Sequence, residues 1–519
     1  MLIKTYCAAL QGIDAIPVTI EVASDRGLMF TMVGMADTAV RESQQRVHLA
    51  ITKSGRQYPH RNIVINLSPA DIRKEGASYD LPIAVGMLVA SDLVSCHDID
   101  RYMIVGELSL DGSVLPVKGI LPMAILAREM GLKGLIVPAA NATEAAVVNN
   151  IDVFGAENLN QVLDHLSGIA PMQPVVVNTR EEFANASSVF DYDFADVKGQ
   201  ETVKRAFEVA CAGGHNIILV GPPGSGKSMM AKRLPSILPP LTLSEALETT
   251  KIHSVAGKLR RGSMLMTARP FRAPHHTISP VALVGGGSNP IPGEISLAHN
   301  GVLFLDEFPE FSRQVLEVMR QPLEDRHISI SRAKYAVDYP ASFMLVASMN
   351  PCPCGYYNHP TKPCTCAPGA VQRYLSRISG PLLDRIDIQV EIMPVPFDEL
   401  SSASEGEHSA SIRERVIAAR SIQSERYRDI PAVHCNAQMT SALIKQHVSL
   451  DSESIARIRD AMERLDMSAR AYDRILKVAR TIADLDGSAD VLPRHVSEAI
   501  NYRSLDRGSW GATAPKLPF

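Results

Sequence analysis

The sequence predicts a multidomain α/β protein, and three observations support this fold class. In residues 1–167, short β-type segments alternate with helical ones, as in IPVTIEVA and DTAVRESQQRVHLAITKSG, which indicates an α+β domain. In residues 194–395, the apolar strands NIILVG, GVLFLD and SFMLVASMN are separated by helical segments, which indicates a parallel sheet covered by helices. Residues 396–505 have helical periodicity throughout and predict a small α-domain.

Two further segments lack periodicity. Residues 168–193 are rich in Pro, Ser and Asn and are expected to form a linker, and residues 506–519 are expected to form a frayed tail. The 519 residues contain no stretch of 18 apolar residues, and the N-terminus is a poor signal peptide. We therefore expect a cytoplasmic protein without membrane contact.

Charge and cysteine content narrow the possible partners. The net charge of −4 creates no global basic field, so contact with nucleic acid would need local patches or a ring that concentrates them. In a reducing compartment the eight cysteines would be free thiols or metal ligands rather than disulfides.

A phosphate-binding loop follows the strand at residues 216–220. The loop reads GPPGSGKS, which matches G-x-x-x-x-G-K-[ST], and a helix is expected from Met229 onward. Glycines let backbone N–H groups wrap an anion, Lys227 would reach the β/γ-phosphates of ATP, and Ser228 would offer its hydroxyl to Mg²⁺. The nucleotide would be held by Gly221, Pro222, Pro223, Gly224, Ser225, Gly226, Lys227 and Ser228.

Two acids end the next apolar strand, GVLFLDE. Asp306 would hold Mg²⁺, and Glu307 would polarise the attacking water. An Asp-Glu pair after a strand is often only a solvated strand end, but its position downstream of a phosphate loop favours the catalytic interpretation.

Four cysteines form two close pairs: Cys352 with Cys354 and, after nine residues, Cys364 with Cys366. Four thiolates around a loop rich in Gly, Tyr, Asn and Pro predict a structural Zn²⁺ site. The C-x-C spacing is tighter than the usual C-x₂₋₄-C. Unmetallated thiols and an iron–sulfur cluster therefore stay open as alternatives.

Three polar segments resemble elements of AAA+ ATPases. SMN, ending at Asn350, resembles the polar sensor, in which Asn350 would orient the hydrolytic water. SGPLLDRIDI resembles an arginine-finger segment, in which Arg385 would stabilise charge at a neighbouring subunit's nucleotide. SAR, ending at Arg470, is similar to the second sensor, and Arg377 and Arg474 stay alternatives for these two roles.

Taken together, GPPGSGKS, FRAPHHTIS, VLFLDEF, NPCPCG, SGPLLDRID and SARAYDRILKVARTIADL resemble the YifB/ComM family, the magnesium-chelatase-like AAA+ proteins of bacteria. The resemblance extends from about residue 2 to 506. It implies an AAA+ core with a helical lid and a homo-hexameric, ATP-dependent DNA motor or helicase. Such a motor would act on single-stranded or branched DNA and promote branch migration when DNA is integrated during natural transformation.

Two insertions are candidate DNA contacts. His275 and His276, followed by three glycines, suggest a loop or hairpin of the helix-2-insert kind, a pore element in related motors. HISISRAKYAVDYP predicts a hairpin with Arg332 and Lys334 near its tip. A ring of cationic tips would contact phosphates with little base specificity. The alternatives are a structural histidine pair or surface loop, and a solvated outer face of the hairpin.

The N-terminal domain looks like a Lon peptidase domain, with Ser78 where the nucleophile would be. The catalytic lysine should follow Gly119, but Leu121, Pro122 and Met123 occupy this segment. Lys118 lies just upstream and is expected to point elsewhere. Because a serine without its base is a weak nucleophile, we expect the domain to be catalytically inactive.

Three other functions compete with a DNA motor. A chelatase motor subunit is opposed by the Lon-like domain and the cysteine insertion, and an ATP-dependent Lon-like protease by the missing lysine. A non-hydrolysing scaffold is opposed by the presence of Lys227, Asp306, Glu307 and Arg385.

Overall fold

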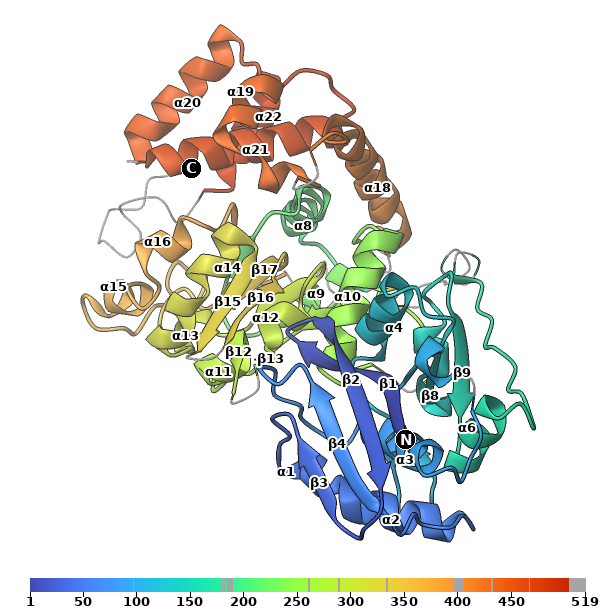
Figure 1. The fold of residues 1–519 in the computed structure, drawn as a ribbon. Helices are drawn as coiled ribbons and strands as arrows, with labels where there is room; N and C mark the ends of the chain where they lie inside the picture. Colours follow the sequence, from blue (N-terminus) through green and yellow to red (C-terminus); the bar gives the residue numbers. More distant parts are fainter. Residues whose placement is uncertain are drawn as a thin grey trace.

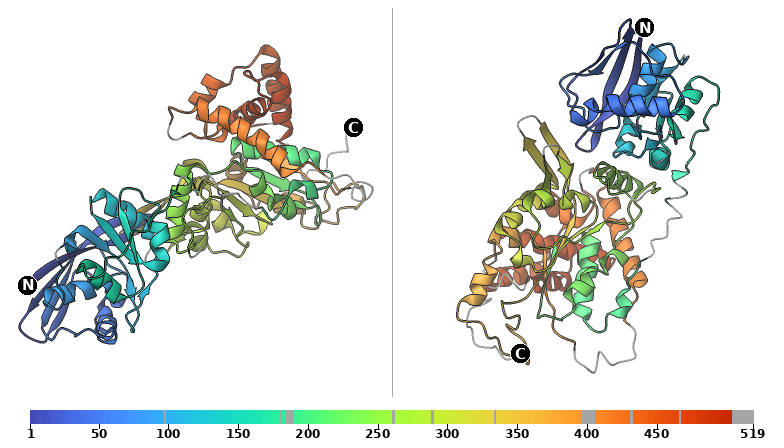
Figure 2. Two further views of the ribbon diagram at one scale, coloured as in Figure 1. Left: turned by 90° about the vertical axis from the view of Figure 1, so that its right-hand side faces the viewer. Right: turned by 90° about the horizontal axis from the view of Figure 1, so that it is seen from below.

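The computed structural model describes residues 1–503 except 97, 180, 182, 184–189, 260–261, 288–289, 333–334, 396–405, 431–432 and 466. The expected tail, 506–519, lies outside the described residues, as does part of the expected linker. An N-terminal mixed-sheet domain, a parallel-sheet core and a C-terminal helical region follow one another, with the core in the middle (Figures 1 and 2). The multidomain α/β prediction is confirmed.

The N-terminal domain is a seven-stranded mixed sheet in the order β3-β4-β2-β1-β5-β8-β9. Its centre is a long antiparallel pair in which Leu2 lies opposite Ala23 and Gln11 opposite Asp14. The strands are β1 (Leu2–Gln11), β2 (Asp14–Asp25), β3 (Phe30–Val33), β4 (Asn62–Ser68), β5 (Tyr102–Ile104), β8 (Gly134–Pro138) and β9 (Asp152–Ala156), with a small ribbon of β6 (Glu107–Leu108) and β7 (Val114–Leu115).

Helices cover this sheet and complete its core. All residues of α3 are buried, which removes the polar face that would mark a surface helix. The helices are α1 (Thr38–Arg41), α2 (Ser43–Lys53), α3 (Asp80–Ala90), α4 (Ile120–Glu129), α5 (Ala142–Ala145) and α6 (Leu159–Leu166). The elements β1, β9 and α6 were not predicted from the sequence.

The core sheet has five parallel strands in the order β11-β14-β17-β10-β18. Because the strands are parallel, the segments that follow β10, β14 and β17 meet at one edge of the sheet. The strands are β10 (Ile217–Val220), β11 (Phe271–Arg272), β14 (Val302–Leu305), β17 (Met344–Met349) and β18 (Ile388–Glu391). The helices are α8 (Glu201–Gly213), α9 (Lys227–Ala231), α10 (Leu243–Val255), α13 (Arg313–Val318), α14 (Arg320–Asp325), α15 (Ala370–Leu375) and α16 (Gly380–Leu383).

Two hairpins extend from this core; the sequence predicted the second as a hairpin and left a loop or a hairpin open for the first. The insert between β11 and β14 contains α11 (Pro280–Val284), β12 (Gly285–Gly286), β13 (Ile291–Pro292) and α12 (Glu294–Leu297). The second hairpin pairs β15 (His327–Arg332) with β16 (Tyr335–Pro340). Lys334 lies outside the described residues, and only the backbone of Arg332 is described.

The C-terminal region is helical, as expected. It contains α18 (Ser409–Arg426), α19 (Ser441–His447), α20 (Ser452–Leu465), α21 (Ala469–Leu485) and α22 (Pro493–Asn501). Apolar residues of α18, α21 and α22 share one core with α8 and the strands β10 and β18, so the helices are attached to the core domain. Among the described residues, none of the helices has the length and apolarity needed to cross a bilayer.

The N-terminal domain contacts the core through α4 and α10. Buried Glu144 accepts hydrogen bonds from the backbone N–H of Leu121 (3.1 Å) and from Ser254 Oγ (2.5 Å), and Gly119 N–H donates to the carbonyl oxygen of Ser254 (3.1 Å). Lys251 of α10 pairs with Asp14. The two parts are therefore joined by polar contacts as well as by the connecting chain.

Candidate nucleotide site and cysteine cluster

The GPPGSGKS loop connects β10 to α9. Gly224 and Gly226 have φ of 79° and 89°, in the left-handed region that favours glycine. At Gly221, an added Cβ would lie 2.4 Å from the carbonyl oxygen of Ile392, so no side chain fits. The loop backbone therefore requires these three glycines for its shape.

Lys227 is held inside the loop. Its Nζ donates to the carbonyl oxygens of Gly221 (2.7 Å) and Pro222 (2.9 Å) and to Asn350 Oδ1 (3.2 Å). Burial lowers the pKa of Lys227, while Asp306 opposes that shift. The structure thus brings Lys227, at the start of α9, together with Asn350, which directly follows β17.

Asp306 and Ser228 meet at the same edge. Ser228 Oγ donates to Asp306 Oδ2 at 2.5 Å, and Ser348 Oγ donates to the other carboxylate oxygen. A hydroxyl and a carboxylate are oxygen ligands of the kind that Mg²⁺ prefers, so this pair fits a magnesium site beside the phosphate loop. Ser348 was not predicted as a site residue, although it lies two residues before Asn350 on β17, next to β14.

Glu307 follows Asp306 and adopts a left-handed backbone with φ of 54°. Its Oε2 lies 3.2 Å from Nδ1 of His276, a residue that the sequence analysis considered as a DNA contact. The neighbouring His275 instead has its Nδ1 2.9 Å from Thr277 Oγ1. The two adjacent histidines therefore have different partners, and one of them lies beside the candidate catalytic base, Glu307.

The arginine candidates differ in their surroundings. Arg385 is mostly buried, pairs with Glu324 and donates from Nη1 to the carbonyl oxygen of Pro381 (2.6 Å). Arg377 is half exposed and pairs with Glu310 at 2.8 Å. Within one subunit, Arg385 is engaged by its own chain, and Arg377 is the more accessible guanidinium.

The two arginines near the start of α21, Arg470 and Arg474, also differ in exposure and in their ion-pair partners. Arg470 is 65% exposed and lies 3.7 Å from Asp384. Arg474 pairs at 2.8 Å with buried Asp387, which also lies 3.3 Å from His215 Nδ1 and accepts the Asn216 N–H. Burial opposes the charge of Asp387, yet Arg474 and His215 hold its pKa well below the usual range. Arg474 therefore links the helical region to the core sheet.

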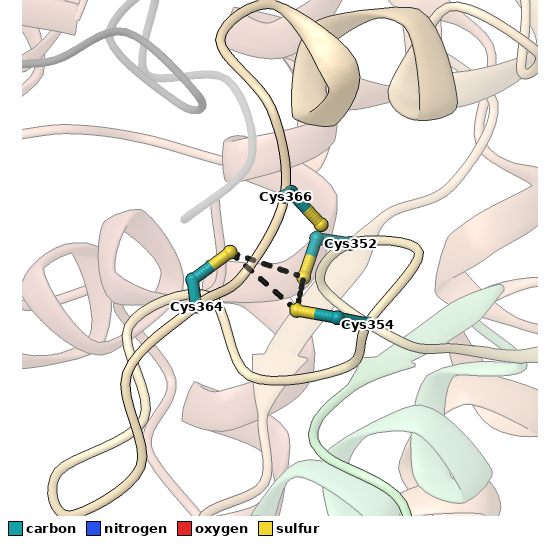
Figure 3. Close-up of side chains that lie close together, drawn as sticks. All are labelled: Cys352, Cys354, Cys364 and Cys366. Carbon is teal, nitrogen blue, oxygen red and sulfur yellow. Dashed lines mark hydrogen bonds between the residues drawn. The ribbon is translucent and has the colours of Figure 1, made fainter.

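The cysteine cluster, formed by Cys352, Cys354, Cys364 and Cys366, is close-packed (Figure 3). All four sulfurs lie within 4.8 Å of one another, and three of the distances are 3.3, 3.5 and 3.8 Å. Tetrahedral Zn²⁺ with Zn–S bonds of about 2.3 Å requires sulfurs about 3.8 Å apart. The cluster therefore fits zinc.

The thiols of the cluster differ in their pKa values, and the loop that carries them contacts the phosphate loop. Burial raises the pKa of Cys352 to about 12 and also raises that of Cys364. Burial opposes ionisation of Cys354, but backbone N–H groups of Tyr356 and Thr365 lower its pKa to about 5. In the same loop, an added Cβ on Gly355 would lie 2.5 Å from Pro223 Cδ. The cysteine loop thus packs directly against the candidate nucleotide-binding loop.

A cavity of about 380 Å³ lies between the N-terminal domain and the core, and both Ser78 and Lys118 line it. Lys118 precedes α4 and lines the same cavity as Ser78. Its methylene groups lie against Gly257 of the core. Among the described residues, no hydrogen bond joins Ser78 Oγ to Lys118 Nζ.

The parallel core, its phosphate loop and its polar strand ends define a magnesium-chelatase-type AAA+ ATPase. The family model "Magnesium chelatase, subunit ChlI" matches residues 193–400, "Subunit ChlI of Mg-chelatase" matches residues 20–141, and "Magnesium chelatase, subunit ChlI C-terminal" matches residues 406–503.

Similarity to individual proteins is more specific. The chain is 43% identical over 505 residues to "Uncharacterized protein YifB" of Escherichia coli, and equally to "Competence protein ComM" of Haemophilus influenzae, covering 97% of each chain. It belongs to the YifB/ComM family. A segment of 170 residues, 30% of this chain and 21% of its relative, is 26% identical to the Lon protease of Halothermothrix orenii.

Proposed function

We propose that this chain is an ATP-hydrolysing motor that acts on DNA as a homo-hexamer in the cytoplasm and promotes branch migration during natural transformation. Full-length similarity to a protein named for competence supports the DNA role. The observation that carries the ATPase role is the convergence of Lys227, Ser228, Asp306 and Asn350 at one edge of the sheet. We propose the domain limits 1–167, 194–395 and 396–505.

In the proposed reaction, Lys227 binds the β- and γ-phosphates, and Asn350 orients the attacking water. Glu307 accepts the proton of that water as its oxygen bonds to the γ-phosphorus, while the bond from the γ-phosphorus to the oxygen that bridges to the β-phosphate breaks, which yields ADP and phosphate. Ser228 and Asp306 would hold Mg²⁺, which when bound neutralises phosphate charge. Arg385, after release from Glu324, would stabilise transition-state charge in a neighbouring subunit, and Arg470 would contact the γ-phosphate from the helical region.

Two variants test the ATPase assignment. Lys227→Ala should abolish ATP binding because the phosphates lose their ammonium partner. Glu307→Gln should bind ATP normally and accumulate as a nucleotide-bound oligomer, because only the hydrolytic step loses its base. Hydrolysis by Glu307→Gln within about threefold of wild type would contradict the assignment.

One assay tests the substrate of the motor. ATPase activity is measured with single-stranded DNA, branched DNA, a porphyrin or an unfolded protein, and we expect stimulation by DNA alone. Stimulation by the porphyrin would support a chelatase subunit, and stimulation by unfolded protein would support a Lon-like protease. The phosphate-loop variant Lys227→Ala is the matched control, since it should remain inactive with every addition.

We further propose that the cysteine cluster holds one structural Zn²⁺ ion. The sulfur spacing and the N–H groups near Cys354 support this site. Zinc would hold together a loop that has little core of its own and that packs on Pro223 through Gly355. The thiolates would thereby keep one side of the phosphate loop in place.

A further inference from the structure

The turn between β1 and β2, formed by Gly12 and Ile13, brings the N-terminal domain against the core beside the β15–β16 hairpin (Figure 1). Gly12 has φ of 64°, and a Cβ added to it would lie 2.5 Å from Cγ1 of Val337 in β16. Ile13 packs against the apolar cluster of the core that contains Val337. Asp14, the first residue of β2, pairs with Lys251 of α10. The turn is therefore held to the core at several points and contacts the hairpin directly.

The hairpin itself is apolar on one face. Alternate residues of its described part are buried, namely Ile328, Ile330, Val337 and Tyr339. A Cβ added to Gly285 of the insert hairpin, β12 with β13, would lie 3.2 Å from Cδ1 of Ile330. Tyr339 Oη donates to the carbonyl oxygen of Pro290, directly before β13, at 2.7 Å. The β15–β16 hairpin therefore packs against both the β1–β2 turn and the insert hairpin.

The contact with the turn lies close to the free end of the β15–β16 hairpin. Val337 lies opposite Ile330, and the ladder ends two pairs further on, at Arg332 opposite Tyr335. At about 3.4 Å per residue, this end is about 7 Å beyond Val337. The hairpin forms a sheet of only two strands, and such a ribbon is marginally stable without packing against another element. Packing against the β1–β2 turn thus fixes the hairpin near its end.

We propose that the N-terminal domain supports the β15–β16 hairpin through the β1–β2 turn, and that Gly12 is a positioning residue whose lack of a side chain permits this contact. A hairpin that is already ordered pays no ordering cost when it binds a polyanion, so the support raises the affinity for that ligand. This gives a mechanical role to a domain that is expected to lack peptidase activity. The identity of the polyanion as DNA rests on the proposed function, whereas the support of the hairpin does not.

The first test is amide hydrogen exchange of β15 and β16 in the full chain. Gly12→Ala places a Cβ against Val337, whose β-branched side chain has little freedom to move away, and should accelerate this exchange about tenfold. The matched control is Gly131→Ala in the same domain. Gly131 has φ of 68°, and among the described residues no neighbouring atom lies within 4 Å of an added Cβ. It introduces the same backbone strain and should leave exchange in the hairpin unchanged.

A second-site variant tests the contact itself. Val337→Ala removes Cγ1 and leaves Cβ 3.8 Å from the position of the new methyl group, an ordinary contact distance. Val337→Ala alone should loosen the hairpin, because it removes buried atoms. Adding Gly12→Ala to Val337→Ala should then accelerate exchange by less than about threefold, whereas independent sites would multiply their effects.

The second test measures binding of single-stranded DNA at several salt concentrations, with a non-hydrolysable ATP analogue present. Gly12→Ala should weaken binding about tenfold at every salt concentration with an unchanged salt slope, because the phosphate contacts remain and only their positioning is lost. Gly131→Ala should stay within about twofold of wild type. Affinity for the ATP analogue should be equal in all variants, which a general structural defect would not produce.

Hairpin exchange in Gly12→Ala that equals wild type, or multiplied effects in the double variant, would overturn the support. If Gly12→Ala does not fold, Ile13→Ala decides, since it removes the apolar contact of the turn without backbone strain, and unchanged hairpin exchange would overturn the support as well. Faster exchange with undiminished DNA binding would overturn the link to affinity. If wild type binds no DNA while exchange changes as expected, the support is upheld and the proposed DNA function fails.

Discussion

Arg474→Ala should weaken the attachment of the helical region to the core, because Arg474 is the cationic partner of buried Asp387. The pair is 2.8 Å apart, Arg474 is 24% exposed and Asp387 is 1% exposed. Breaking a buried pair by removing one partner costs about 3–5 kcal/mol. His215 and the Asn216 N–H still contact the Asp387 carboxylate in the variant. We therefore expect the loss of stability to be about 3 kcal/mol, at the lower end of this range.

The matched control lies one helical turn earlier on α21. Arg470 is 65% exposed and 3.7 Å from Asp384, a surface pair worth less than about 0.5 kcal/mol. Arg470→Ala should therefore leave stability unchanged, while it should lower ATP hydrolysis if Arg470 has the sensor role. The two variants thus separate attachment of the helical region from sensing of the nucleotide.

The assay is amide hydrogen exchange at pH 7, because a multidomain chain does not unfold in two states. A loss of about 3 kcal/mol should accelerate exchange of the slowest amides in α21 about a hundredfold. Because Arg474 lowers the folded pKa of Asp387, this stabilisation is present above the unfolded pKa of about 3.9 and is lost as the pH falls below it. Exchange in Arg474→Ala within about threefold of wild type would refute the reasoning.

Arg385→Ala should reduce ATP hydrolysis by roughly 10³-fold with ATP affinity nearly intact, and mixing it with Lys227→Ala should restore some activity if the site is shared between subunits. No recovery on mixing two oligomeric proteins would count against a shared site. Freshly reduced protein should contain about one Zn²⁺ per chain by metal analysis, and replacing all four cluster cysteines by serine should abolish zinc binding. Substoichiometric zinc in the wild-type protein would contradict the zinc site. Alanine at both Arg332 and Lys334 should weaken binding of all DNA sequences and flatten its salt dependence, with basal ATPase retained. An unchanged salt slope would locate the DNA contacts elsewhere.

The sequence by itself determined those features that depend on residues close together in the chain. GPPGSGKS requires glycines at defined positions because the backbone at Gly224 and Gly226 is left-handed and Gly221 has no room for a side chain. The spacing of the cluster cysteines was sufficient to predict that they meet, and the fold class followed from the periodicity of its segments. The catalytic roles assigned to these motifs stay predictions.

Only the tertiary structure decided which distant side chains share an environment. Strand order places β17 between β10 and β14, and periodicity carries no information on that order, so Ser348 and its contact with Asp306 were missed. The same holds for His276, which the insert brings to Glu307. The sequence offered both Arg470 and Arg474 as candidates for one role. Helical geometry and packing expose Arg470 and pair Arg474 with the buried carboxylate of Asp387. Burial and partner choice arise from packing between segments, and this is the physical reason why the sequence could name candidates but could not choose among them.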